Sequence, residues 1–223
     1  ISTQILAETV NKYIIPSNPS FGAISEAVSK LPVSAAAPAE DESKGVSAME
    51  VDEAAAAAAS PVAAAAKPPS STLPEVEVYI FTLVIMTMLR EKLYTEAMYY
   101  STLLVERIRS FNRRSLDFLA SKAFFYFSLA YEKQGKLENI RSSLLVLYRT
   151  ACIHQDEYSQ AMLLNLILRN YLYYNLFDQA HTLSLRSSFP ENASHNQFCR
   201  YLYYMGRIQA IQADYSEAFQ RLM

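Results

Sequence analysis

The chain has 223 residues and a formal net charge of −2 at pH 7. It therefore has room for a large domain, and no charge excess that would attract it to nucleic acid or an anionic membrane. Its two cysteines, Cys152 and Cys199, are too few for a disulfide scaffold and indicate a reducing compartment. The longest apolar run, Tyr79–Leu89, is too short to span a bilayer, and the first residues lack a signal-peptide pattern. We expect a soluble intracellular protein without a membrane partner.

Residues 1–31 are predicted to form short N-terminal helices. The first has apolar residues at helical spacing and ends before Pro16, and the second runs from Ser20 to Lys30 and ends before Pro32. Neither has much aromatic mass, so both need another surface to pack on. The apolar positions of the first helix are Ile5, Leu6, Val10, Tyr13 and Ile14.

Residues 32–74 are predicted to be a disordered linker or insertion rich in alanine, proline and acidic residues. Its prolines interrupt regular structure, and its side chains are too small to bury a core. The alanine run Ala54–Ala59 favours at most a short helix. Of the 27 aromatic residues, only Tyr13 and Phe21 precede residue 79, so the buried core is expected in residues 75–223.

From Leu73-Pro74-Glu75, which is typical of a helix start, the chain repeats one plan four times. A long helix and a turn are followed by a large residue and, three positions later, a small or aliphatic one. The repeat length of about 40 residues predicts an all-α fold, an α-solenoid of tetratricopeptide-like helical hairpins, because a hairpin cannot bury its own apolar face alone. The paired positions are Tyr94 and Ala97, Leu137 and Ile140, Phe177 and Ala180, and Tyr215 and Ala218.

The stretch Leu163–Ala180 is the centre of this pattern. Its first half is apolar on almost every side, which predicts a helix buried all round, and Asn175 separates it from a return helix that starts at Phe177. Cap signals agree with the helix boundaries. Asp214 and Glu217, and likewise Ser194 and Gln197, have capping-box spacing; Gly135 suits a left-handed helix end; and Pro190 lies in a loop between hairpins.

We predict no catalytic, cofactor-binding or metal-binding residues. His195 and Cys199 lie one helical turn apart, but a zinc site needs further ligands, so a helix-start histidine and a buried cysteine are favoured. Cys152 and His154 diverge on a helix, and His181 fits the surface of a return helix. No GxSxG, GxGxxG, HExxH or phosphate-loop motif occurs, so the chain is not expected to be an enzyme.

Two groups of residues remain as candidate contact sites. Arg107, Arg109, Arg113 and Arg114 surround Phe111; they could bind nucleic acid, but cations at a helix C-terminus more often cap the helix or face protein, so nucleic acid is the less favoured partner. The tyrosine pairs are expected in the core or lining grooves, with some rings at an interface. These pairs are Tyr99-Tyr100, Tyr173-Tyr174 and Tyr203-Tyr204.

The runs Ser115–Ala180 and Asn196–Ala218 resemble the family of regulatory subunit 3 of the 26S proteasome, and LLNLILRNYLYYNLFDQA and NQFCRYLYY carry most of the likeness. This family consists of non-ATPase, PCI-containing subunits in the lid of the 19S regulatory particle. The resemblance implies a non-catalytic scaffold that supports ATP-dependent degradation of ubiquitinated proteins. Its implied partners are other lid and regulatory-particle subunits in a large hetero-oligomer.

The resemblance also implies a location in cytoplasm and nucleus, and a winged-helix PCI module that this sequence does not include. We therefore expect residues 75–223 to be a solenoid that is incomplete at its C-terminus. The alternative is a scaffold subunit of a related PCI complex, either the signalosome or a translation initiation factor. A nucleic-acid-binding helical protein is the remaining, less favoured alternative.

Overall fold

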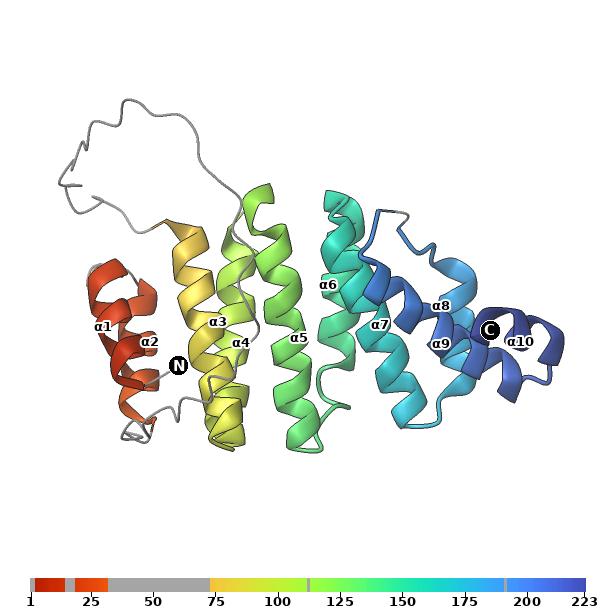
Figure 1. Ribbon diagram of the computed structural model, residues 1–223, viewed down its shortest axis with the longest axis horizontal. Coiled ribbons are helices and arrows are strands. Elements are labelled where there is room, and N and C mark those ends of the chain that lie inside the picture. Colours follow the sequence, from red (N-terminus) through yellow and green to blue (C-terminus); the bar gives the residue numbers. More distant parts are fainter. Residues whose placement is uncertain (1–2, 15–18, 32–72, 112, 191) are drawn as a thin grey trace, which may run out of the picture.

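A computed structural model of the chain describes residues 3–14, 19–31, 73–111, 113–190 and 192–223. Within these ranges all regular structure is helical, and no strand is present. The helices follow one another in a row from the N-terminal to the C-terminal end (Figure 1). They are α1 Thr3–Tyr13, α2 Pro19–Ser29, α3 Pro74–Arg90, α4 Tyr94–Ser110, the 3-10 helix η1 Arg114–Leu116, α5 Asp117–Lys133, α6 Arg141–His154, α7 Glu157–Tyr173, α8 Phe177–Arg186, α9 His195–Ile211 and α10 Tyr215–Leu222.

The packing order of the helices is that of a solenoid. Each odd-numbered helix from α1 to α7 contacts the next odd-numbered one, and each even-numbered helix from α2 to α8 contacts the odd-numbered helix that follows it. Each apolar face is thereby covered by the next hairpin, which confirms the predicted all-α, tetratricopeptide-like solenoid. The N-terminal helices α1 and α2 take part in this row, because α1 and α2 both contact α3 and α2 also contacts α4.

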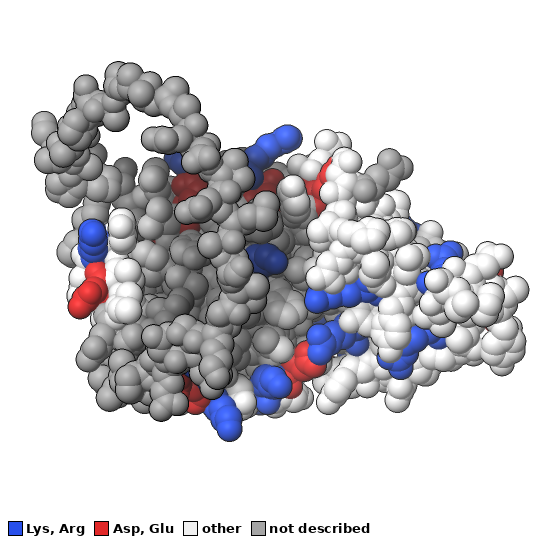
Figure 2. Space-filling view, viewed as in Figure 1, with Lys and Arg blue, Asp and Glu red and all other residues white. Residues whose placement is uncertain are grey.

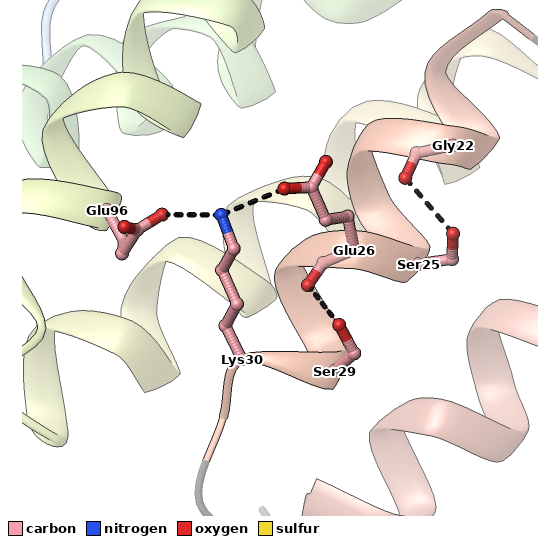
Figure 3. A network of polar contacts seen from close by, with 6 residues as sticks. All are labelled: Gly22, Ser25, Glu26, Ser29, Lys30 and Glu96. Atoms are coloured by element: carbon pink, nitrogen blue, oxygen red, sulfur yellow. Dashed lines mark hydrogen bonds and ion pairs between the residues drawn. The ribbon is translucent and has the colours of Figure 1, made fainter.

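Two polar clusters hold α2 against the next hairpin. In the first, the Lys30 Nζ lies 2.9 Å from Glu26 Oε1 and 3.0 Å from Glu96 Oε2 on α4 (Figure 3). The hydrogen bond from Lys30 lowers the pKa of Glu26, but both groups are exposed, so solvent screens this cluster. In the second, Ser20 donates a hydrogen bond to Glu77 of α3, whose side chain is only 2 % exposed.

Helix α7 is the most deeply buried element of the stack. Every residue from Ala161 to Leu168 is buried, as the apolar pattern predicts. Two buried amides tie the helix to its neighbours on both sides. Asn170 donates from Nδ2 to the Leu137 carbonyl at 2.8 Å, and Asn165 donates to the Gln197 carbonyl of α9 at 2.9 Å.

The turns inside four hairpins each contain one residue in the left-handed conformation. Lys92, Gly135, Asn175 and Ala213 each have a positive φ, between 56° and 69°. In each turn the residue after the left-handed one donates a backbone hydrogen bond to a carbonyl five residues earlier, as in a Schellman motif. The prediction for Gly135 is confirmed, and the same conformation occurs at Lys92, Asn175 and Ala213 and, between α6 and α7, at Gln155.

Some local predictions are wrong. Asp214 and Ser194 are N-cap residues as expected, but neither side chain caps its helix, and Glu217 instead accepts a hydrogen bond from Gln209. Tyr215, the large residue of the fourth repeat, is exposed, because α10 lies at the end of the described stack. Among the helices from α3 to α10, whose N-caps the structure describes, a side chain closes the N-terminus only at α7, where Asp156 accepts from the Ser159 N–H at 3.1 Å.

The second hairpin, α5 and α6, is more open than predicted. The closely packed helix pairs of the described residues include α6 with α7 and α5 with α7, but not α5 with α6. Helix α6 also starts at Arg141, four residues after Leu137, whereas α4, α8 and α10 start at the large residue of the repeat. The predicted linker, residues 32–74, lies outside the described residues except for its last two, and the division into domains stays a prediction.

Leu166 tests the burial of α7. We expect Leu166→Asp to lower the free energy of unfolding by about 3 kcal/mol or more, because it places an unpaired carboxylate in a buried seam. Leu166 is 6 % exposed, whereas Leu185 on α8 is 73 % exposed, so Leu185→Asp is the matched control and should change stability little. Urea unfolding followed by circular dichroism gives both values, and equal losses would contradict the packing of α7.

Lys92 tests the left-handed turns. We expect Lys92→Gly to raise the free energy of unfolding by about 0.5–1 kcal/mol, because glycine avoids the left-handed penalty at the cost of some chain entropy. The adjacent Glu91 has a φ of −77°, so Glu91→Gly should destabilise the protein instead. Thermal melts that shift in the same direction for both variants would refute this reading of the turn.

Candidate interaction surface

The histidines and cysteines do not gather into a reactive site. Cys152 and Cys199 are both exposed free thiols, so the expectation that Cys199 is buried is wrong. His195 is exposed on the first turn of α9, and His181 on α8 is partly buried. In the part of the chain that the structure describes, no three His, Cys, Asp or Glu side chains are placed to hold a metal ion.

The predicted arginine cluster divides into a structural part and a surface part. Arg107 donates from Nε to the buried Glu77 at 2.8 Å, and its guanidinium lies over the Phe111 ring at 4.6 Å. Arg107 therefore joins α4 to α3, and the cluster does not form a continuous basic strip. Arg109, Arg113 and Arg114 remain exposed around the corner between α4 and α5.

Each tyrosine pair places one ring inward and one ring outward. Tyr100 is completely buried while Tyr99 is exposed. Tyr174 and Tyr204 are partly buried, and each directly follows a tyrosine whose ring faces solvent. Tyr173 is 61 % exposed and Tyr203 is 51 % exposed. The prediction that these rings divide between core and surface therefore applies within each pair.

Two of these pairs meet across α7 and α9. Tyr173, Tyr203 and Tyr204 line a shallow hollow of about 450 Å³ together with residues of α5, α7 and α9. We call this surface the tyrosine–arginine ledge. Its members are Glu132, Arg169, Leu172, Tyr173, Tyr203, Tyr204 and Arg207.

Charges on the ledge are arranged around the rings. Arg169 contacts Glu132 of α5 at 2.6 Å, which neutralises this cation and links two repeats. Arg207 lies 5.7 Å from the centre of the Tyr203 ring and forms no ion pair within the described part of the chain. Burial raises the pKa of Tyr204, so its hydroxyl stays protonated and able to donate a hydrogen bond.

This arrangement suits contact with another protein. The visible face of the C-terminal half shows several basic side chains with few acidic ones between them (Figure 2). Tyrosine and arginine are the residues that most often dominate binding energy at protein interfaces. Glu132 is paired with Arg169, so the acidic and one of the basic side chains of the ledge hold each other in place.

The tyrosine pairs were predicted as interface candidates, whereas Arg169, Arg207 and Glu132 were not. Tyr203 and Arg207 are four residues apart and lie on one face of α9, so their spacing could have indicated a shared surface. Arg169 and Glu132 come from different repeats, and only the stacking of α5 and α7 brings them together. None of the helices in the described ranges is both long and apolar enough to span a membrane.

Comparison with known proteins gives a consistent result. The family described as PSMD3-like, N-terminal TPR repeats matches residues 1–223. The chain is 49% identical over 148 residues to the 26S proteasome non-ATPase regulatory subunit 3 of Dictyostelium discoideum, which covers 66% of this chain and 29% of the relative. It is 46% identical over 149 residues to homolog B of the same subunit from Arabidopsis thaliana, covering 67% and 31% respectively. The matched stretch thus spans about a third of these relatives.

Arg107 tests whether the arginine cluster is structural. We expect Arg107→Met to lower the free energy of unfolding by about 3 kcal/mol, because it removes the cation from a buried carboxylate. Replacing both partners, Glu77→Leu with Arg107→Met, should recover much of that loss. Arg109→Met, at an exposed residue two positions away, is the control and should stay within about 0.5 kcal/mol. Similar chemical denaturation curves for the two single variants would show that the pair does not stabilise the fold.

Proposed function

Because the chain belongs to the PSMD3-like family with N-terminal TPR repeats, we propose that it is a structural subunit of the 26S proteasome regulatory particle. In this proposal its helical stack lies in the lid and positions neighbouring subunits during ATP-dependent degradation of ubiquitinated proteins. The observation that carries the proposal is the identity of 46–49% to relatives named as non-ATPase regulatory subunit 3. The corresponding location is cytoplasm and nucleus.

The structure supports a role in contact rather than in catalysis. A solenoid gives a long surface for its volume, because each hairpin contacts only its neighbours and leaves its remaining sides exposed. The tyrosine–arginine ledge provides an exposed contact surface on a firmly packed part of that stack, against the buried helix α7. Rigid rings on a rigid support lose little conformational entropy on binding.

The proposal is tested by co-purification of the tagged full-length protein from its own cells. Proteasomal ATPases and other regulatory-particle subunits are expected in the eluate. Recovery of signalosome subunits or translation initiation factor subunits in their place would overturn the proposal and assign the chain to a related PCI complex.

The ledge is tested in the same experiment. We expect Tyr203→Ala combined with Arg207→Glu to reduce co-purification severalfold, since a truncated ring and a reversed charge at an interface each cost about 1–2 kcal/mol of binding free energy. Both residues are exposed, so the melting temperature should hardly change. Tyr99→Ala, an equally exposed tyrosine on α4, is the matched control and should leave co-purification intact. If the double variant co-purified with the other subunits as well as the unmodified protein does, the ledge would not be part of the interface.

A further inference from the structure

A groove runs between α4 and α6, above α5. It consists of two hollows, of about 580 Å³ and about 210 Å³, and both are lined by Arg109 of α4 and Leu147 of α6. Phe124 of α5 lies in the larger hollow and Phe127, one turn later, lies in the smaller one. The groove exists because α5 and α6 are not closely packed, as described above.

The groove has the dimensions of an extended peptide. The α6 wall reaches from Ser142 in the smaller hollow to His154 in the larger one. That stretch corresponds to a length of about 18 Å at 1.5 Å per helical residue. Five or six residues of an extended chain, at about 3.3 Å each, have the same length.

The lining provides what the backbone of an extended peptide needs. Such a backbone has no internal hydrogen bonds, so its N–H and C=O groups need partners on the receptor. Hydroxyl side chains lie along the groove from end to end, from Thr102 and Ser143 in the smaller hollow to Thr150 and Ser159 in the larger one. Thr102 and Thr150 already donate to carbonyls of their own helices, so they are left as acceptors for a peptide N–H.

Ser159 gives independent evidence for a ligand. It lines the larger hollow and is 1 % exposed, yet its Oγ has no hydrogen-bond partner among the residues that the structure describes. An unsatisfied buried hydroxyl is unfavourable, and native proteins usually pair such groups. A ligand backbone group in the groove would provide the missing partner.

The groove is lined by charges of both signs: the cations are Arg109, Arg113 and Arg114, and the acids are Glu106, Asp117 and Asp156. Arg113 lies 3.8 Å from Glu75, and Arg114 is close enough to Asp117 to oppose the rise in the pKa of Asp117 that burial causes. Arg109 forms no ion pair within the described residues, and it lies where the two hollows join. Glu106 lies one turn before Arg109 in the smaller hollow, but no ion pair within the described residues joins the two, so the Arg109 guanidinium can still bind a carboxylate.

We propose that this groove binds an extended peptide segment of another protein, with an acidic residue at Arg109 and apolar residues on either side of it. Alternate side chains of an extended chain point the same way, so apolar residues two positions before and after the acid reach the hollows of Phe124 and Phe127. The backbone between them meets the hydroxyl-lined walls. The mixed signs at the rim, with Asp117 beside Arg114, disfavour a nucleic-acid backbone.

The test measures fluorescence anisotropy of labelled nonapeptide pools on the purified full-length protein. Each pool has Glu, Gln or Lys fixed at its centre, mixed Leu, Ile, Val and Phe two positions to either side, and mixed Ser, Thr, Ala and Asn elsewhere. We expect the Glu pool to bind about tenfold more tightly than the Gln pool, as a charge-assisted hydrogen bond allows. The Lys pool should bind least.

Variants locate the binding. Arg109→Gln should remove the preference for Glu, whereas Arg90→Gln, at an exposed arginine outside the groove, should retain it. Ser159→Ala should weaken binding of the Glu pool about threefold without lowering the melting temperature, because the wild-type hydroxyl has no partner to lose.

Three outcomes would overturn the proposal. The first is a Glu pool that binds no better than the Gln and Lys pools. The second is a preference for Glu that persists in Arg109→Gln. The third is a labelled oligothymidine that binds more tightly than the Glu pool and depends on Arg109, which would assign the groove to nucleic acid.

Discussion

The burial of α7 on all sides is the constraint on which the rest of the structure depends. Helices α5, α6, α8 and α9 all contact it, so it is the inner wall of two consecutive repeats. Its apolar residues alone do not determine the register of α7 against its neighbours, because apolar contacts are not directional and tolerate small shifts. The two buried amides supply the register, since Asn170 reaches back to Leu137 and Asn165 reaches forward to Gln197.

Along the rest of the stack, too, apolar contacts form the core and a few polar contacts connect neighbouring helices. Glu77 links α3 to α2 through Ser20 and to α4 through Arg107, and the more exposed Lys30 cluster adds a weaker tie. The left-handed turns reverse the chain within a few residues, so each return helix lies beside its partner. Where the turn is longer, after α5, the hairpin opens and a groove forms between α4 and α6.

This construction agrees with the proposed scaffold role. Among the described residues, Arg107, Asn165 and Asn170 use their polar atoms in contacts between the helices of the stack. The outward members of the tyrosine pairs, by contrast, are supported from below by their buried neighbours. Such support from the core agrees with the proposed role in positioning a partner.

The sequence by itself determined the helical periodicity, the repeat length and the burial of α7, because these depend on residues close together in the chain. It also identified the family through the local runs around Leu163–Ala180. It could not determine which partners the polar side chains take: Glu217 was assigned to a cap but bonds Gln209, and Arg107 was grouped with its sequence neighbours but pairs with Glu77. Only the tertiary structure determines the ledge and the groove, because each is formed by side chains from several helices. Whether these side chains come together depends on how closely successive hairpins pack.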